Sequence, residues 1–317
     1  MRRPAARHPV RVLLLLLALF ALLPGAAGLA QPARRAPAPA ASEPLAPLLW
    51  EIRRGDSRIS LFGTVHALPR GVAWFRPHVV EALDSADELV LETLVPESPA
   101  LAPEMLRMAR LPAPRPVFER VPPEWQARLN AELERLKPIP LAWMKTWYVA
   151  LTLMNLEAER QGFSPAVGAE AVLAARARLK SKPIRALETL EEQLTFFDSL
   201  SEADQQQLLI GVLEAMADSR ARWEAIIAHW TAGRVDLLGE LVDRQFRRSP
   251  MLEQLLLRDR NARWAAWMDE ALREPGHRFV AVGAGHMAGR HSLLAELAAR
   301  GLEARPVLPP RPERRRR

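Results

Sequence analysis

The chain has 317 residues, no cysteine and a formal net charge of +7 at pH 7. The absence of cysteine excludes disulfides, thiolate metal sites, catalysis by a thiol and a lipid anchor on an N-terminal cysteine. Residues 1–42 contribute +6 and residues 301–317 contribute +4 to the charge, so residues 43–300 are near −3. This span lacks the clustered Lys and Arg of a nucleic-acid-binding surface, and we expect no nucleic-acid partner.

The first 30 residues have the layout of a secretory signal peptide. Four arginines between positions 2 and 11 are followed by the apolar run Val12–Leu23, which Pro24 and Gly25 end. The run is short for a membrane span, and small residues follow it through Ala30. The sequence therefore predicts a signal peptide at residues 1–30 and an exported protein, periplasmic or extracellular. The alternative is an uncleaved N-terminal anchor, which would be the protein's contact with a membrane.

Low-complexity segments flank the rest of the chain. Residues 31–47 are rich in Pro and Ala and predict a mobile linker, and residues 306–317, which end in four arginines, predict a disordered tail. The remaining span, residues 48–305, is long enough to bury a large core as one domain or as one domain with a helical insertion.

The first part of this span predicts a strand hairpin and a crossover. Apolar runs at Leu48–Ile52 and Arg58–Phe62, joined by a turn, indicate two paired strands. A helical pattern over Pro77–Ser85 and a short strand at Glu88–Leu91 follow. Strand, helix and strand within this length form a βαβ unit, whose paired strands are expected to be parallel.

The rest of the span is mainly helical. A short strand is expected at Ile184–Leu187 and a last clear strand at Arg278–Val282. The pattern predicts an α/β fold with a mixed central sheet flanked by helices and a large helical insertion between two Gly-x-x-His halves. The helices expected cover much of residues 103–162, and then residues 167–179, 191–197, 202–217, 219–231, 237–246, 252–272 and 292–300.

The most informative feature is a turn that occurs twice. In Arg58–His66 and in Arg278–His286, an arginine starts an apolar strand, a glycine follows the strand, and a histidine stands three residues after the glycine. Glycine lets the chain leave a buried strand through a turn that a Cβ would obstruct. Each histidine then lies beyond the carboxyl end of a strand, where open α/β sheets gather their ligands.

Two carboxylates fit the same scheme. Glu92 and Glu188 each follow an apolar strand-like run, so with parallel neighbouring strands they converge with His66 and His286. Imidazole and carboxylate together suit Zn, Mn, Co or Fe, and a bound ion lowers the pKa of a water and polarises a carbonyl. No Gly-x-Ser-x-Gly or His-Glu-x-x-His motif occurs, which argues against a serine hydrolase elbow and a zincin.

Structural roles compete with these functional ones. A single histidine is more often a hydrogen-bonded structural group than a ligand, and the pair in matching contexts is what favours function. Two roles fit Glu92 equally well. It is either a metal ligand or general base, or a structural carboxylate that accepts backbone hydrogen bonds. Arg260 fits a group that orients a ligand or a substrate carboxylate, and it also fits a plain salt bridge.

With these motifs, most of residues 45–303 resembles the TraB/GumN family, which includes the Tiki-type proteins. The resemblance implies an α/β fold in which the two Gly-x-x-His halves face each other across one cleft. It also implies a metal-dependent peptidase, since Tiki-type members are described as such and are often supported by manganese or cobalt. The segments that carry the resemblance are Leu61–Pro69, Glu88–Glu92, Val167–Glu170, Lys182–Thr189 with Gln193, Arg260–Asn261 and Val282–Gly289.

Residue by residue, the resemblance implies a candidate site. The cofactor implied is a divalent ion (Mn, Co or Zn), and the partner implied is a peptide or protein substrate. Two positions depart from the family pattern: Glu170 stands where the family usually has aspartate, and Thr93-Leu94 replaces a more acidic end of the strand that carries Glu92. The candidate metal ligands or catalytic residues are His66, Glu92 and His286, with Glu188, Arg260 and Asn261 as supporting catalytic residues.

Three hypotheses follow for the function. The first is an exported metal-dependent hydrolase of peptide or amide bonds. The second is a non-catalytic protein on the same scaffold, in which the cleft holds a ligand, haem or a metal without turnover. The third is an interaction protein anchored by an uncleaved N-terminus.

Overall fold

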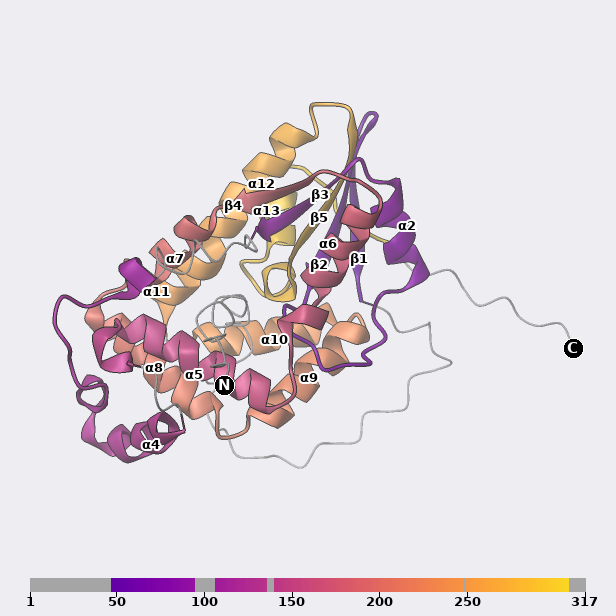
Figure 1. The fold of residues 1–317 in the computed structure, drawn as a ribbon. Helices are drawn as coiled ribbons and strands as arrows, with labels where there is room; N and C mark the ends of the chain where they lie inside the picture. Colours follow the sequence, from indigo (N-terminus) through magenta and orange to yellow (C-terminus); the bar gives the residue numbers. More distant parts are fainter. Residues whose placement is uncertain (1–46, 95–105, 136–139, 248, 308–317) are drawn as a thin grey trace, which may run out of the picture.

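The computed structural model describes residues 47–94, 106–135, 140–247 and 249–307 (Figure 1). The predicted signal peptide, nearly all of the predicted linker and residues 308–317 of the predicted tail lie outside the described residues. Within the described part, no helix is both long and apolar enough to cross a membrane.

Six strands form one mixed sheet in the order β4-β3-β5-β2-β1-β6. The four strands from β4 to β2 are mutually parallel, and β1 and β6 extend this group with antiparallel pairing. The strands are β1 Leu49–Arg54, β2 Ser57–Thr64, β3 Glu88–Thr93, β4 Ile184–Glu188, β5 Gly276–Gly283 and β6 Arg305–Val307.

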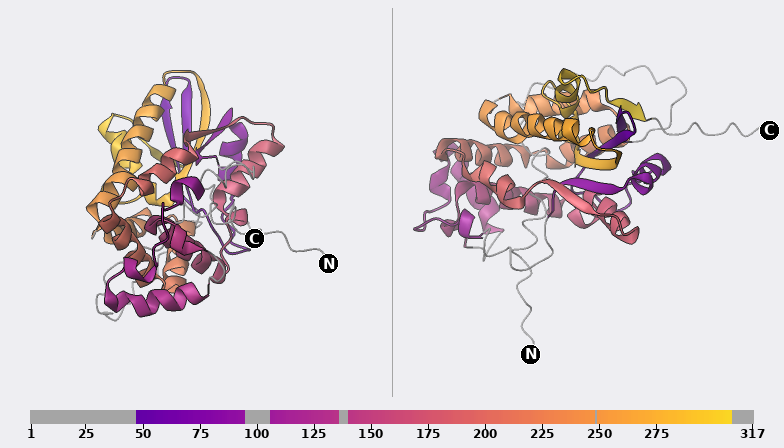
Figure 2. Two further views of the ribbon diagram at one scale, coloured as in Figure 1. Left: turned by 60° about the vertical axis from the view of Figure 1, so that its left-hand side comes forward. Right: turned by 90° about the horizontal axis from the view of Figure 1, so that it is seen from above.

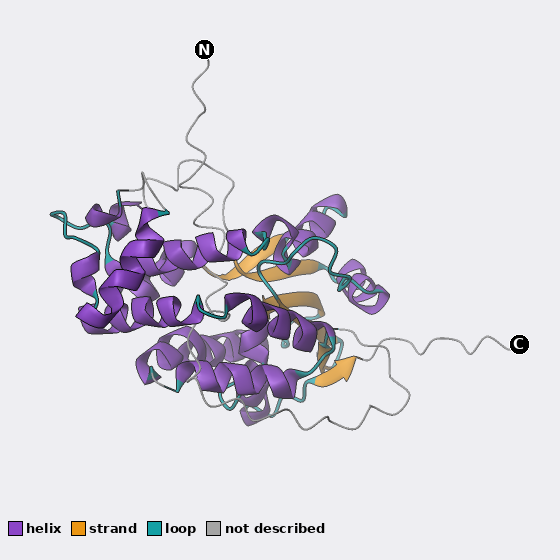
Figure 3. Ribbon diagram, turned by 90° about the horizontal axis from the view of Figure 1, so that it is seen from below, coloured by secondary structure: helices purple, strands orange, loops and turns teal. Residues whose placement is uncertain are grey.

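Helices cover both faces of this sheet, and more helices lie beyond one end of the strands (Figure 1). Helices make up most of the molecule when it is seen from below (Figure 3). They are α2 Pro77–Ser85, α4 Pro123–Glu134, α5 Thr146–Arg160, α6 Ala169–Leu179, α7 Leu190–Asp198, α8 Glu202–Ala215, α9 Ser219–Thr231, α10 Val235–Phe246, α11 Pro250–Glu253, α12 Asp259–Ala271 and α13 Leu293–Ala299.

Alternation along the strands separates two apolar layers. On one face, Phe62 and Phe279 pack with residues of α2 and α6, and on the other, Ile59 and Val280 pack with residues of α12 and α13. A third cluster, built mainly from α5 and α8, forms the core of the helical insertion. The left view of Figure 2 shows this insertion below the sheet, beyond one end of the strands. The α/β fold with a helical insertion, predicted from the sequence, is confirmed.

The strand order differs in one respect from the simplest expectation. The hairpin of β1 and β2 is confirmed, but β2 and β3 are not paired with each other, because β5 lies between them and pairs in parallel with both. The crossover through α2 therefore spans one strand position. A consequence for function is that the carboxyl ends of β4, β3, β5 and β2 lie side by side at one edge.

Three element boundaries also differ from the prediction. The stretch predicted as disordered tail begins with a strand, since β6 pairs with β1. The helix predicted over residues 252–272 is divided by a π-helix at Gln254–Arg258, which ends just before α12. The helix predicted from Val167 begins at Ala169, with Gly168 as its N-cap. The last two differences affect the positions of Arg260 and Glu170, as described below.

Candidate functional site

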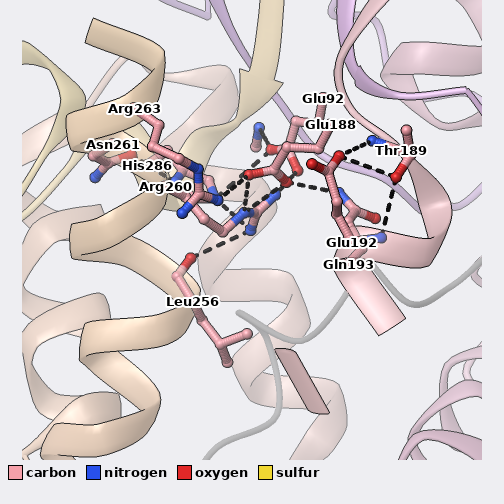
Figure 4. Close-up of polar contacts among 11 residues, drawn as sticks. Glu92, Glu188, Thr189, Glu192, Gln193, Leu256, Arg260, Asn261, Arg263 and His286 are labelled. Carbon is pink, nitrogen blue, oxygen red and sulfur yellow. Dashed lines mark hydrogen bonds and ion pairs between the residues drawn. The ribbon is translucent and has the colours of Figure 1, made fainter. Parts of the chain in front are cut away.

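The candidate site lies at the carboxyl ends of the four parallel strands. Glu92 is in β3, which continues through it to Thr93, and Glu188 ends β4. His66 and His286 follow β2 and β5, and all four side chains are buried. The convergence expected from the two repeated turns is therefore present, and Figure 4 shows its centre.

A guanidinium occupies the middle of the cluster. Arg260 of α12 is only 4% exposed, and its Nη2 donates to Oε2 of Glu92 at 2.8 Å. Its Nε donates to Oε2 of Glu188 at 3.0 Å, and its Nη1 lies 3.1 Å from Nε2 of His286. The same Nη1 donates to the carbonyl of Leu256, in the π-helix, at 3.2 Å (Figure 4). Arg260 is thus part of the buried cluster rather than of a surface salt bridge.

Aromatic rings and a second arginine hold this guanidinium in place. The Arg260 guanidinium carbon lies 4.6 Å from the ring centroid of Trp264 and 5.7 Å from that of Phe196. Arg263, one turn along α12 and half exposed, donates to the other oxygen of Glu188 at 2.9 Å. Glu188 therefore accepts hydrogen bonds from two arginines, and its position is fixed from both sides.

The protonation pattern of His286 follows from its neighbours. Asn261 donates its Nδ2 to the carbonyl of His291 at 2.7 Å, so its Oδ1 faces Nδ1 of His286, also at 2.7 Å. Nδ1 therefore carries the hydrogen, and the lone pair of Nε2 faces Arg260. Burial, together with the positive charge of Arg260, holds the pKa of His286 well below its ordinary value, so the ring stays neutral.

His66 is oriented by a carboxylate that the sequence prediction did not include in the site. Oε1 of Glu170 lies 2.5 Å from Nδ1 of His66, and the Thr64 hydroxyl donates to the same oxygen. Burial lowers the pKa of His66, but the Glu170 carboxylate outweighs burial and raises the pKa above its ordinary value. Burial favours the protonated form of Glu170, yet His66 and Thr64 lower the pKa of this carboxyl. The sequence marked Val167–Glu170 as a segment that resembles the family and Glu170 as a departure from its pattern, but not as a partner of His66.

The glycine of the second repeated turn, Gly283, is required for space rather than for its backbone conformation. Gly283 has an ordinary φ of −54°, and Gly63 is likewise not among the residues with positive φ. A Cβ at Gly283 would lie 2.9 Å from Nε2 of His66 and 3.1 Å from Oε1 of Glu92. The backbone N–H of Gly283 also donates to that oxygen of Glu92. The expectation of a glycine-specific turn is therefore replaced by a close approach of the backbone to two site residues.

The predicted site residues fall into two linked groups. Glu92, Glu188, Arg260 and His286 share direct contacts, and Asn261 supports His286 from behind. His66 lies across Gly283 from Glu92, and Glu170 must be added as its partner.

A divalent ion does not fit these side chains as they stand. Two imidazoles and a carboxylate form a suitable donor set in their chemistry. Over the described ranges, however, no three His, Asp or Glu side chains are arranged so that they hold an ion. The contacts of Arg260 give a physical reason, because its guanidinium takes both an oxygen of Glu92 and the Nε2 lone pair of His286.

A cavity of about 450 Å³ opens beside Glu188. Its walls are mainly apolar and come from Leu94, the end of β4 and the start of α7, through residues 186–192. The capping box between Thr189 and Glu192 fixes the first turn of α7. A ligand of moderate size in this cavity would contact the buried cluster through Glu188.

Comparison with known proteins shows the family of the chain. Residues 48–306 match the TraB/PrgY/gumN family. The chain is 24% identical over 249 residues to YbaP of Escherichia coli (strain K12), a protein described as uncharacterized, covering 75% of this chain and 87% of YbaP. YbaP of Shigella flexneri gives the same identity and coverage. No solved structure gives a significant match. Because the family match spans nearly the whole described region, this chain belongs to the TraB/PrgY/gumN family.

Proposed function

We propose that the chain is an exported hydrolase of peptide or amide bonds, dependent on a divalent metal ion, with its active site at the carboxyl ends of β4, β3, β5 and β2. The observation that carries the proposal is the burial of two histidines and two glutamates, His66, His286, Glu92 and Glu188, from four neighbouring parallel strands at that edge. Buried ionisable groups are costly in a protein core and collect where chemistry is done.

The residues have distinct roles in this proposal. His66 and His286, with Glu92, would hold the ion, in place of the contacts that Glu92 and His286 make with Arg260. Each histidine has one nitrogen fixed by a partner, Glu170 or Asn261, which leaves Nε2 as the nitrogen for the site. Such outer partners set the tautomer and orientation of metal-binding histidines. Glu92 acts as a ligand or as the general base, and the apolar cavity beside Glu188 takes an apolar side chain of the substrate.

Metal content and peptide cleavage together test the proposal. The purified mature protein is incubated with a mixed peptide library and Mn²⁺, Co²⁺ or Zn²⁺, and the products are identified by mass spectrometry. We expect cleavage that EDTA abolishes, and we expect the double variant His66→Ala/His286→Ala to lose both bound metal and cleavage. His229→Ala, on α9, is the matched control and should behave like the wild type. Metal-free protein that cleaves nothing under all these conditions would refute the enzymatic proposal.

A binding protein without turnover is the second candidate. The observation that favours it is the guanidinium of Arg260, which satisfies Glu92 and His286 within the protein. In this case, the double-histidine variant would lose metal while its binding of peptides stayed unchanged. Export is tested separately by the mass of the mature N-terminus, which a cleaved signal peptide places near residue 31.

The carboxylate of Glu170 gives a quantitative test of the ligand assignment. Glu170→Gln removes the negative partner that fixes His66 through Nδ1, and we expect metal affinity to fall by about 10–100-fold, as for other outer partners of metal-binding histidines. Equilibrium dialysis against Mn²⁺ measures the effect. Glu159→Gln, an exposed position on α5, is the control. An unchanged affinity in Glu170→Gln would remove His66 from the ligand set.

A further inference from the structure

The arginine at the centre of the site uses the atoms that a metal ion needs. Arg260 donates to Oε2 of Glu92 and to the Nε2 lone pair of His286, at 2.8 and 3.1 Å. Oε1 of Glu92 lies 3.8 Å from the same Nε2. An imidazole nitrogen has one lone pair in the ring plane, and this lone pair serves one partner at a time. Arg260 and an ion bound to His286 are therefore mutually exclusive partners.

The charges of the cluster explain why an arginine stands there. Glu92 and Glu188 are both almost fully buried, at 2% and 4% exposure. Two carboxylates without a partner in such a place are strongly destabilising, and the guanidinium between them, together with Arg263 on Glu188, compensates their charges. A divalent ion in contact with Glu92 would supply the same compensation. It would also repel the guanidinium at close range, where water does not screen the two charges.

Arg260 has partners that do not depend on His286. Its Nε donates a hydrogen bond to Glu188, and its guanidinium lies near the rings of Phe196 and Trp264. These contacts leave the arginine a place within the site after the contacts with His286 and Glu92 are given up.

We propose that Arg260 is a resident cation that competes with the metal ion for Glu92 and His286, so that ion binding requires displacement of its guanidinium from both. This inference rests on the metal dependence proposed above. The arginine stabilises the metal-free protein and at the same time weakens its affinity for the ion. Metal uptake is then an exchange of one cation for another, and the protein does not need the ion in order to fold.

Metal affinity measured on variants of the full chain tests this exchange. Arg260→Met keeps much of the side-chain volume and removes the competing charge, and we expect Mn²⁺ to bind it at least about tenfold more tightly than the wild type. Isothermal titration calorimetry, with Mn²⁺ electron paramagnetic resonance as a second readout, measures the affinity. If Arg260 had only a structural role, its loss would loosen the site, and Arg260→Met would bind Mn²⁺ more weakly than the wild type.

Two further variants make the result decisive. Arg263→Met removes a cation from Glu188 but leaves the contact with His286 intact, so we expect less than about a threefold change in affinity, since Arg263 is half exposed and screened. Arg260→Lys keeps a charge for the carboxylates without the planar fork that reaches Glu92, Glu188 and His286 together. It should fold if Arg260→Met does not, and it should also bind Mn²⁺ more tightly than the wild type.

The possible failures are distinguishable. Equal or weaker Mn²⁺ binding by the Arg260 variants that fold, beside measurable binding by the wild type, overturns the exchange and leaves the proposed function standing. No Mn²⁺, Co²⁺ or Zn²⁺ binding by any variant overturns both the exchange and the metal dependence.

Discussion

Gly168→Ala is expected to prevent stable folding of the domain, with a loss of more than about 4 kcal/mol in the free energy of unfolding. A Cβ at Gly168 would lie 2.6 Å from the carbonyl carbon of His66 and closer still to its oxygen. Both atoms belong to the backbone, and the neighbouring Ala169 N–H donates to the carbonyl of Val65 at 3.0 Å. No flexible side chain is available to move aside, so the two segments must separate.

Urea denaturation followed by circular dichroism measures this effect, with expression as soluble protein as the first observation. Gly301→Ala is the matched control, because φ is +74° there and a Cβ meets nothing within 4 Å. Only the conformational preference of glycine is lost in the control, at a cost of about 1 kcal/mol. A cost for Gly168→Ala as small as that of the control would show that the His66 segment and the start of α6 are not in close contact.

Glu92→Ala is expected to reduce the stability of the metal-free protein by about 3–5 kcal/mol, the range found when one partner of a buried ion pair is removed. Glu92 is 2% exposed, and it accepts hydrogen bonds from Arg260 and from the backbone N–H of Gly283. The substitution leaves the guanidinium with less compensation and leaves a buried N–H without its acceptor. Both losses occur away from water.

The measurement is again urea denaturation, here in the presence of EDTA so that bound metal does not contribute. Glu51→Ala serves as the control, because Glu51 pairs with the largely exposed Arg53 on β1, and such pairs contribute less than about 1 kcal/mol. If Glu92→Ala and Glu51→Ala cost the same, then Glu92 is not held in a buried network, and the centre of the candidate site has been placed wrongly.

Much of the site was predictable because it depends on local sequence patterns. An apolar strand followed by glycine and a histidine three residues later predicted two ends of parallel strands, and the glutamates Glu92 and Glu188 marked two more. All four strands were placed within a few residues, and the α/β class with a helical insertion is confirmed. These features follow from side-chain alternation and from the rule that parallel strands end together.

The remaining features depend on contacts between distant segments. Nothing in the sequence near β5 indicates that it lies between β2 and β3, since strand order is decided by packing of the whole sheet. The role of Glu170 depends on how α6 approaches His66. This approach depends on Gly168 as the N-cap of α6, which the sequence pattern did not indicate. Arg260 was identified, but its position among Glu92, Glu188 and His286 depends on the π-helix that precedes α12. The glycine of the second turn was predicted for its conformation, whereas the structure requires it for space.

The position of β5 has a consequence for how the chain acquires its structure. This strand is in the middle of the sheet, yet it is almost the last element to be synthesised, more than 180 residues after β3. Earlier segments can form helices and the β1–β2 hairpin on their own, but β2 and β3 have no neighbour to join them until β5 arrives. Such distant pairing is slow, so we expect a late, concerted closure of the domain. A chain cut before Gly276 would then not bring the two halves of the site together, because the missing strand is the one that connects them.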